Sequence, residues 1–419
     1  MSGRTKTAGP TPPVGPAAAL RVISSRNFGP YFFGNALSSS GTWFQNLAAA
    51  LLVYRLTHSA FLLGILNAAQ FGPVLLLAPW IGLAADRFDR RRLLIATQLW
   101  ATMLSGTLAG LAWSGDAHAW VVIVFALGLG VSSAYAAPAS GALVGQLVSP
   151  RDLASAVALN SMTYNLARAI GPALAAVTVR TLGIPAAIAI NSGSYLALVL
   201  GLTLVRPRPQ ERPPRDETRL LASLRFVRER PKLLALLLII AAVGFGSDPV
   251  NTEAPAFAHA FGEVDTQAGY IIGVFGAGAV AAAFTVAGRV AGSRTRMATT
   301  LFLLGGGMVA LSVTPWLSLG YAFLFVAGFG YLASNTSATT RLQLDVHESQ
   351  RGRIMALWSV AFLGLRPLAS LLDGTIAGAF GVRVAGVCLA IPALAAAAVI
   401  VRLRDRPLSR TEALAPPQS

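Results

Sequence analysis

Long apolar segments without charge, separated by short charged loops, are the feature that most constrains this fold. The chain of 419 residues is 54% hydrophobic and only 12% charged, and a soluble protein of this size carries about twice that charged fraction. About twenty consecutive apolar residues are enough for a helix to cross a bilayer. Lipid offers no partner to backbone polar groups, so such segments must be helical. We therefore predict an all-α, multi-pass membrane protein.

The hydropathy pattern predicts twelve transmembrane helices. Their expected bounds are 28–54, 60–85, 93–114, 119–144, 153–179, 184–205, 233–258, 268–288, 297–315, 317–340, 354–380 and 383–401. A long central loop divides them into two six-helix bundles. The predicted organisation is a disordered cytoplasmic N-terminal tail (1–27), a first bundle (28–205), a cytoplasmic loop (206–232), a second bundle (233–401) and a cytoplasmic C-terminal tail (402–419). From Glu217 the loop forms either an amphipathic surface helix or a solvated linker.

The positions of the basic residues predict the orientation. The two tails and the even-numbered loops hold 28 of the 33 Lys and Arg residues, and the opposite loops hold only Arg55, Arg180 and Arg383. Cytoplasmic loops carry the excess of positive charge, so we expect both termini in the cytoplasm. The net charge of +16 therefore indicates membrane topology, and we expect no nucleic-acid partner.

The two halves of the chain form a weak repeat. At an offset of 198 residues Arg168 aligns with Arg366, and Gly183 aligns with Gly381. Both arginines thus fall at equivalent depth, in the fifth and eleventh spans. Repeated halves are typical of secondary transporters, whose substrate site lies near the midplane between them.

Ionisable side chains inside spans are candidate functional groups, because each costs several kcal/mol unless it is paired or hydrated. We expect five of them to form a proton-coupling and substrate cavity: Arg168, Asp248, Glu253, Arg366 and Asp373. Asp248 is the preferred proton site. It lies about 22 Å into its span, among prolines and glycines whose irregular backbone survives in a membrane where it lines a cavity. The alternative is that this helix ends early and places Asp248 and Glu253 in an outer loop.

The other candidates leave alternatives open. Arg366 and Asp373 share one helix face about 10 Å apart, which is too far for a direct pair. Each arginine either binds an anionic group of a substrate, neutralises an acidic side chain, or bonds backbone carbonyls structurally. The first span carries polar residues, Asn35 and Gln45 among them, and we expect these two in the cavity wall.

The loop between the second and third spans carries a distinctive motif. Gly82, Asp86, Arg87, Arg90 and Arg91 match the pattern Gly-x-x-x-Asp-Arg-x-Gly-Arg-Arg, and Asp89 stands where the pattern has its second glycine. The segments 59–64, 165–173 and 351–353 match as well. In these residues the chain resembles the major facilitator superfamily, in particular its bacterial exporter branch of enterobactin and macrolide efflux proteins, the transmembrane secretion effector type. The resemblance covers about residues 20–405.

This resemblance implies a secondary active transporter in a bacterial inner membrane that works by alternating access. It would export a small amphipathic molecule (a drug, siderophore or secondary metabolite) as an antiporter driven by proton entry. Gly82, Asp86, Arg87, Arg90 and Arg91 would form a conformational latch against the cytoplasmic start of the eleventh span. Gly171 and Pro172 would form a helix bend. The chain departs from the family's antiporter motif, since Ala175 and Ala176 replace the usual glycines.

Alternatives of other kinds remain. An uptake permease or lipid transporter would share the fold, and a non-transporting receptor or scaffold would need a larger ordered loop than this chain has. No catalytic constellation and no phosphate-binding glycine loop occurs in the sequence. We therefore expect no enzyme activity, no metal and no cofactor. The expected partners are a small-molecule substrate, protons and the lipid bilayer, and we expect a monomer.

Overall fold

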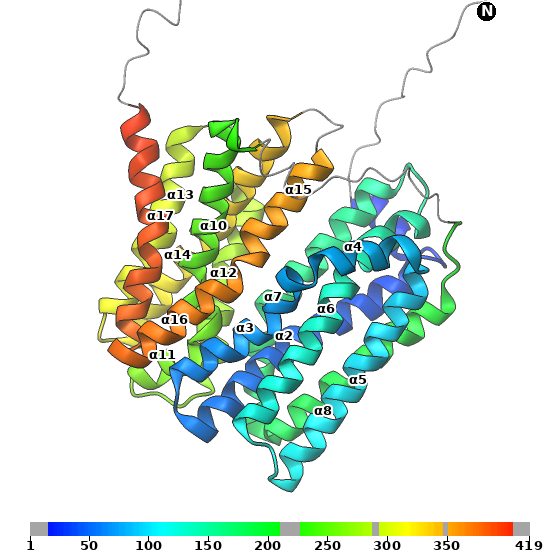
Figure 1. Ribbon diagram of the computed structural model, residues 1–419, viewed down its shortest axis with the longest axis horizontal. Coiled ribbons are helices and arrows are strands. Elements are labelled where there is room, and N and C mark those ends of the chain that lie inside the picture. Colours follow the sequence, from blue (N-terminus) through cyan, green and yellow to red (C-terminus); the bar gives the residue numbers. More distant parts are fainter. Residues whose placement is uncertain (1–15, 210–226, 287–292, 347–350, 405–419) are drawn as a thin grey trace, which may run out of the picture.

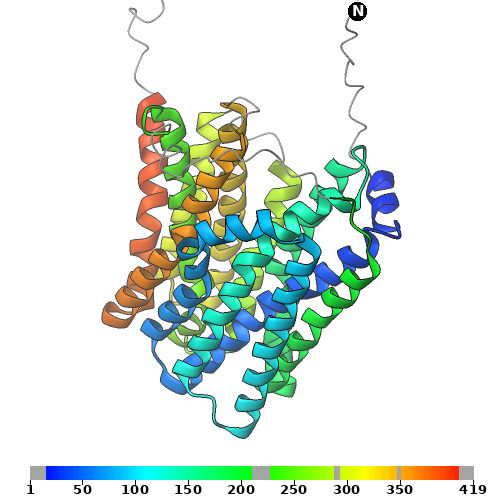
Figure 2. The same ribbon diagram turned by 45° about the vertical axis from the view of Figure 1, so that its right-hand side comes forward.

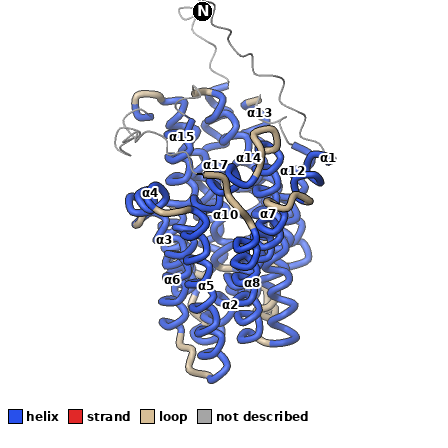
Figure 3. Tube along the Cα trace, turned by 90° about the vertical axis from the view of Figure 1, so that its right-hand side faces the viewer, coloured by secondary structure: helices blue, strands red, loops and turns tan. Residues whose placement is uncertain are grey.

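Helices make up all the regular secondary structure that is described, as the tube in Figure 3 shows. The computed structural model describes residues 16–209, 227–286, 293–346 and 351–404. Two sets of helices lie side by side in Figure 1, with α10–α17 on the left and α2–α8 on the right. This arrangement is the predicted architecture of two helical bundles.

The first set follows the first six predicted spans. Its helices are α1 (Pro16–Ile23), α2 (Gly29–Thr57), α3 (Ala60–Leu76), α4 (Ala78–Arg87), α5 (Arg90–Ser114), α6 (Ala119–Leu147), α7 (Leu153–Leu182) and α8 (Ile184–Leu204). The second set follows the other six. Its elements are α10 (Pro231–Thr252), α11 (Ala254–Ala260), α12 (Gln267–Val286), α13 (Arg294–Val313), α14 (Leu317–Leu344), α15 (Arg351–Ser359), the π-helix η2 (Val360–Gly364), α16 (Arg366–Phe380) and α17 (Val382–Arg404).

All twelve predicted spans contain helix. Nine helical stretches in the described part of the chain are long and apolar enough to cross a membrane, and α3 is a shorter apolar helix. The remaining spans correspond to α2 and α7, which carry more polar residues. This is the arrangement expected for a twelve-helix membrane protein.

Three predicted spans are interrupted. The second breaks at Leu77, and α4 turns away from α3 (Figure 2). The seventh breaks at Glu253 between α10 and α11, and both α4 and α11 begin with a proline in their first turn. A proline supplies no backbone N–H and tolerates the first turn of a helix, so it starts a new helix readily. In the eleventh span, η2 directly precedes α16.

The two sets of helices meet along glycine-lined seams. A Cβ placed on Gly64 of α3 would lie 2.5 Å from the Ser370 carbonyl oxygen and 2.9 Å from the Gly374 Cα of α16. In the second seam a Cβ on Gly276 of α12 would lie 2.7 Å from the Ala169 Cα of α7. Small residues let membrane helices approach this closely. At both seams the backbones of the two sets of helices are therefore in close contact.

The predicted N-terminal tail needs a correction. Residues 16–23, inside the region 1–27 that we expected to be disordered, form helix α1, and Val22 is buried against the bundle. Arg21 donates to Asp152 Oδ1 at 2.5 Å, ahead of α7, and this bond lowers the pKa of Asp152 below its usual range. Most of the expected surface helix from Glu217 and of the C-terminal tail lies outside the described residues.

Candidate functional site

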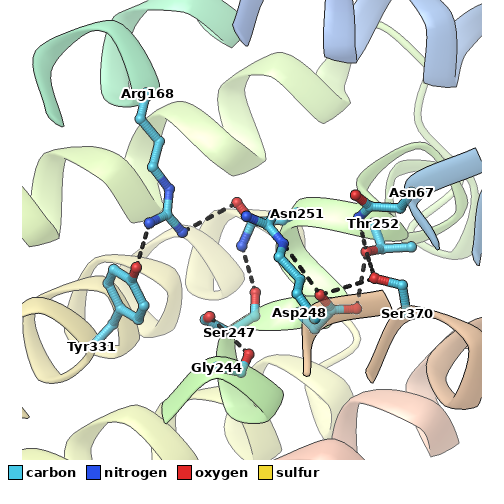
Figure 4. A network of polar contacts seen from close by, with 10 residues as sticks. Asn67, Arg168, Gly244, Ser247, Asp248, Asn251, Thr252, Tyr331 and Ser370 are labelled. Atoms are coloured by element: carbon cyan, nitrogen blue, oxygen red, sulfur yellow. Dashed lines mark hydrogen bonds and ion pairs between the residues drawn. The ribbon is translucent and has the colours of Figure 1, made fainter. Parts of the chain in front are cut away.

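Asp248 lies inside α10 and is bonded on both carboxylate oxygens (Figure 4). Its side chain is only 1% exposed. The Ser370 hydroxyl donates to Oδ1 at 3.2 Å, and the Thr252 hydroxyl donates to Oδ2 at 3.0 Å. The structure thus places Asp248 within the helix rather than in an outer loop. Two hydroxyl donors supply part of the solvation that this buried carboxylate loses.

Arg366 is the charged partner of Asp248. Its Nε atom lies 3.7 Å from Asp248 Oδ1, and both side chains are largely buried. Arg366 begins α16 directly after the π-helix η2, a kind of distortion that occurs often at functional sites. Its guanidinium Cζ lies 4.1 Å from the centre of the Phe71 ring and 5.9 Å from that of Trp43, which is within the range of cation–π attraction.

Neutral polar side chains from three helices complete this network. Asn67 of α3 donates from Nδ2 to the Thr252 hydroxyl of α10, which also lies 3.4 Å from the Ser370 hydroxyl of α16. None of these three residues is among the site residues predicted from the sequence. The signal available was weak: each is an uncharged polar residue within an apolar span, and such residues cost much less in a membrane than charges do.

Arg168 approaches the same region from α7. It donates from one terminal nitrogen to the Tyr331 hydroxyl and from the other to Asn251 Oδ1 at 3.4 Å. Its Cζ lies 4.7 Å from the centre of the Tyr331 ring and 5.4 Å from that of Trp43. The two arginines related by the sequence repeat therefore meet at one tryptophan, Trp43 of α2.

Glu253 and Asp373 are also buried here, without hydrogen-bond donors. Both are fully inaccessible to solvent, and their carboxylate oxygens have no hydrogen-bond partner among the residues that the structure describes. A negative charge on one of them would repel a charge on the other, and a charge on Asp248 would repel both. All five ionisable residues predicted for the site thus lie in one electrostatically connected region.

Asn35 and Gln45 lie apart from the Asp248 network, and their place in a cavity wall stays a prediction. Asn35 donates to Asn160 Oδ1 of α7 at 3.0 Å. Gln45 is buried, and its Oε1 accepts from the Ser105 hydroxyl of α5 at 2.7 Å and also from Asn191 of α8. These bonds hold α2 within the first set of helices. Both side chains therefore stabilise that bundle and do not join the Asp248 network.

Residues of the loop motif form hydrogen bonds to helices within the first set. Asp89, which departs from the family pattern, accepts the Arg92 backbone N–H at 2.8 Å and so caps α5. Arg90 bonds the Ala142 carbonyl of α6 at 3.4 Å. Arg91 bonds the Leu202 carbonyl at 2.6 Å, near the end of α8, where a cation also complements the helix dipole.

The other latch residues remain predictions. Arg87 is exposed at the end of α4. Gly82 and Asp86 lie on α4, but their side chains are outside the part of the chain that the structure describes. Arg90 and Arg91 contact their own half, so nothing in their bonds joins the two bundles.

Gly171 has a packing role. A Cβ there would lie 2.9 Å from Trp43 Cβ and 3.0 Å from the Ser40 carbonyl oxygen, so only glycine lets α7 approach α2 so closely. Helix α7 continues through Pro172, and a bend at Gly171 and Pro172 stays a prediction.

A small cavity lies at this site. Its volume is about 30 Å³, which is room for about two water molecules and far too little for a drug-sized ligand. Its lining residues come from both halves: Trp43, Asn46, Leu47, Ala50, Leu63, Leu66, Asn67, Gln70, Phe71, Pro172, Asn251, Thr252, Pro255, Ile272 and Arg366. A separate groove of about 630 Å³ runs between α4, α5 and α6, lined by aromatic rings such as Trp80, Trp100 and Tyr135.

Comparisons with known proteins agree with this architecture. The profile of the transmembrane secretion effector family matches residues 17–418. The staphyloferrin A transporter of Staphylococcus aureus is 27% identical over 84% of this chain and 90% of that protein. The multidrug efflux pump Tap of Mycolicibacterium fortuitum is 24% identical over 90% of this chain and 96% of that protein.

Solved structures of transporters share the fold. A bacterial homologue of the human lysosomal transporter Spinster, in an inward-facing and occupied conformation, aligns with a TM-score of 0.73 at 14% identity, over 92% of this chain and 99% of that one. The nucleoside transporter NupG aligns with a TM-score of 0.66 at 11% identity, over 93% and 100%. The family match and the shared fold together show that this chain belongs to the transmembrane secretion effector family of major facilitator transporters.

Proposed function

We propose that this protein exports a small amphipathic molecule in exchange for protons, and that Asp248 carries the proton. The observation that supports this most is the buried ion pair between Asp248 and Arg366, which joins α10 to α16 at the wall of the small cavity. The names of the efflux relatives support export. We expect the protein to act as a monomer.

The ion pair offers a physical means of coupling. A buried pair is stable only while both charges are present, and removal of one charge leaves the other uncompensated at a cost of about 3–5 kcal/mol. A proton on Asp248 would remove its attraction to Arg366, and α16 would then be free to move relative to α10. Arg366 itself cannot lose its charge. Proton binding and helix rearrangement are thereby linked through one contact.

The contacts between the halves support an outward-closed state. Arg55, at the end of α2, forms an ion pair with Asp265 ahead of α12, and Tyr54 packs against His259 with ring centres 6.2 Å apart. The distribution of positive charge predicts that this end lies outside the cell. In alternating access, closure at this end belongs to the state that takes substrate from the cytoplasm.

The proposal is tested in two steps. A susceptibility and accumulation screen, in a strain that lacks its own exporters, identifies a transported solute. Inverted membrane vesicles then accumulate that solute when a proton gradient is imposed. We expect a protonophore to abolish accumulation, and accumulation that persists without the gradient would reject proton coupling.

An uptake permease is the second candidate, because the nucleoside transporter NupG shares the fold and the helix arrangement does not set a direction. Net movement of the screened solute into whole cells, driven by the proton gradient, would favour uptake. A screen that finds no transported solute would favour a receptor or scaffold.

A further inference from the structure

The two arginines of the site differ in how their charge is balanced. Arg366 faces the carboxylate of Asp248 at 3.7 Å. Arg168 bonds two neutral groups, the Tyr331 hydroxyl and the Asn251 side-chain amide. Asp248 attracts both arginines, but one carboxylate balances one cation. Glu253 and Asp373 do not neutralise Arg168 through hydrogen bonds, since neither carboxylate has a hydrogen-bond donor in the described part of the chain.

The positive charge of Arg168 is therefore available to bind another anion. A guanidinium stays protonated in proteins and offers five N–H donors, of which two are bonded to described residues. An arginine in a membrane interior is costly unless it is paired. A carboxylate matches the planar fork of the guanidinium and forms shorter, stronger bonds with it than neutral acceptors do.

Aromatic rings surround the same guanidinium. Trp43 and Tyr331 present their rings to it, and Tyr164, one turn before Arg168 on α7, meets Trp43 edge to face with ring centres 6.0 Å apart. Tyr164 is 47% exposed, so part of this aromatic wall is accessible. Flat, largely apolar walls beside a single charge suit a ligand with an apolar ring system and one anionic group.

We infer that Arg168, with Tyr331, Asn251 and the Trp43 ring, binds the anionic group of the exported molecule, and that this molecule is an amphipathic organic carboxylate. The inference rests on the proposed function. The two repeat-related arginines then have different roles: Arg366 pairs with the proton-binding carboxylate, and Arg168 binds the substrate. Binding of such a molecule requires the site to open, since the cavity beside it has a volume of only about 30 Å³.

A matched pair of probes tests this assignment. Naphthalene carboxylate and naphthalene carboxamide share one ring system and differ in charge, and their binding to the purified full-length protein is measured in the same buffer. We expect the carboxylate to bind about tenfold more tightly or better. Arg168→Gln should remove this preference and leave carboxamide binding unchanged, whereas Arg180→Gln, the same change at an exposed position of α7, should retain it.

A second variant covers the case in which Arg168→Gln does not fold. Asn251→Asp places a carboxylate 3.4 Å from Arg168 and should displace the probe anion, so the carboxylate loses its advantage. The inference is overturned if both probes bind the wild type equally, if neither binds, or if the preference survives Arg168→Gln or Asn251→Asp.

The outcome separates the inference from the proposed function. Suppose the carboxylate binds through Arg168, but a proton gradient moves neither it nor any screened solute. The binding site then stands and the proposed function fails. If a neutral solute is exported with protons and no carboxylate preference exists, the proposed function stands and the inference fails.

Discussion

Three carboxyl groups at the centre of this protein share their burial and differ in their partners. Asp248 has two hydroxyl donors and Arg366 beside it. Glu253 and Asp373 have no donor among the described residues. A buried carboxylate without a donor costs several kcal/mol, and the protonated acid avoids most of that cost. We therefore assign a charged form to Asp248 in this state and a protonated, neutral form to both Glu253 and Asp373.

Amide substitutions distinguish these assignments. Glu253→Gln and Asp373→Asn replace a neutral acid with a neutral amide of similar shape, so the temperature of thermal unfolding should change little. Asp248→Asn leaves Arg366 without its carboxylate and should cost about 3–5 kcal/mol of stability. Thermal unfolding of the purified variants measures this, with Asp345→Asn at an exposed position as control. A large loss in Glu253→Gln and none in Asp248→Asn would reverse the assignments.

The charged residues of this site could be predicted from the sequence, and their neutral partners could not. Arg168, Asp248 and Arg366 stand out because charges within apolar spans are rare and costly. Asn67, Thr252 and Ser370 do not stand out, since uncharged polar residues occur throughout the spans. The same ambiguity applies to Asn35 and Gln45: in this structure their side chains make contacts within one bundle, and the packing of α2 against α5, α7 and α8 decides this.

The interruptions in the helices lie at the candidate site. The break between α10 and α11 and the π-helix before α16 lie beside Glu253 and Arg366 respectively. The prolines around Asp248 predicted the first break. Nothing comparable predicted the π-helix, because it depends on how the helix is held by its neighbours. The seam between α3 and α16 likewise depends on packing, although Gly64 belongs to a segment that matched the family.

The α3–α16 seam gives a prediction about helix packing. A Cβ on Gly64 would lie 2.5 Å from the Ser370 carbonyl oxygen, so Gly64→Ala should force α3 away from α16. We expect transport of the screened solute to fall about tenfold or more, while the protein still folds. Gly72→Ala is the matched control, since it lies on the same helix with no atom within 4 Å of the new Cβ. Equal activity of the two variants would show that the seam is unimportant.

At the scale of the whole molecule, the sequence predicted the twelve-helix architecture and the family, since hydropathy and the loop motif are local signals. It did not predict the conformational state. The outward-closed state that we propose rests on contacts such as Arg55 with Asp265, and a transporter must form and break such contacts in each cycle. A sequence that supports two states of similar free energy cannot favour one of them by pattern alone.

We propose that the latch forms in the alternative state, in which Asp86 contacts the cytoplasmic start of the eleventh span when the inner side closes. Asp86→Asn should therefore slow turnover and leave substrate affinity nearly unchanged, because the contact forms away from the binding site. Asp89→Asn is the control, since asparagine caps a helix as well as aspartate does. Turnover and affinity measured on both variants decide this, and an equal loss of the two in Asp86→Asn would contradict a latch.

The most direct test of the central claim is transport by purified protein in liposomes, with and without an imposed pH gradient. The wild type should accumulate the screened solute when the gradient is present and should also exchange labelled for unlabelled solute without it. Asp248→Asn should lose the gradient-driven accumulation, because it cannot carry the proton, and should retain exchange. Gradient-driven accumulation by Asp248→Asn at the wild-type level and with the same pH dependence would show that Asp248 does not couple protons to transport.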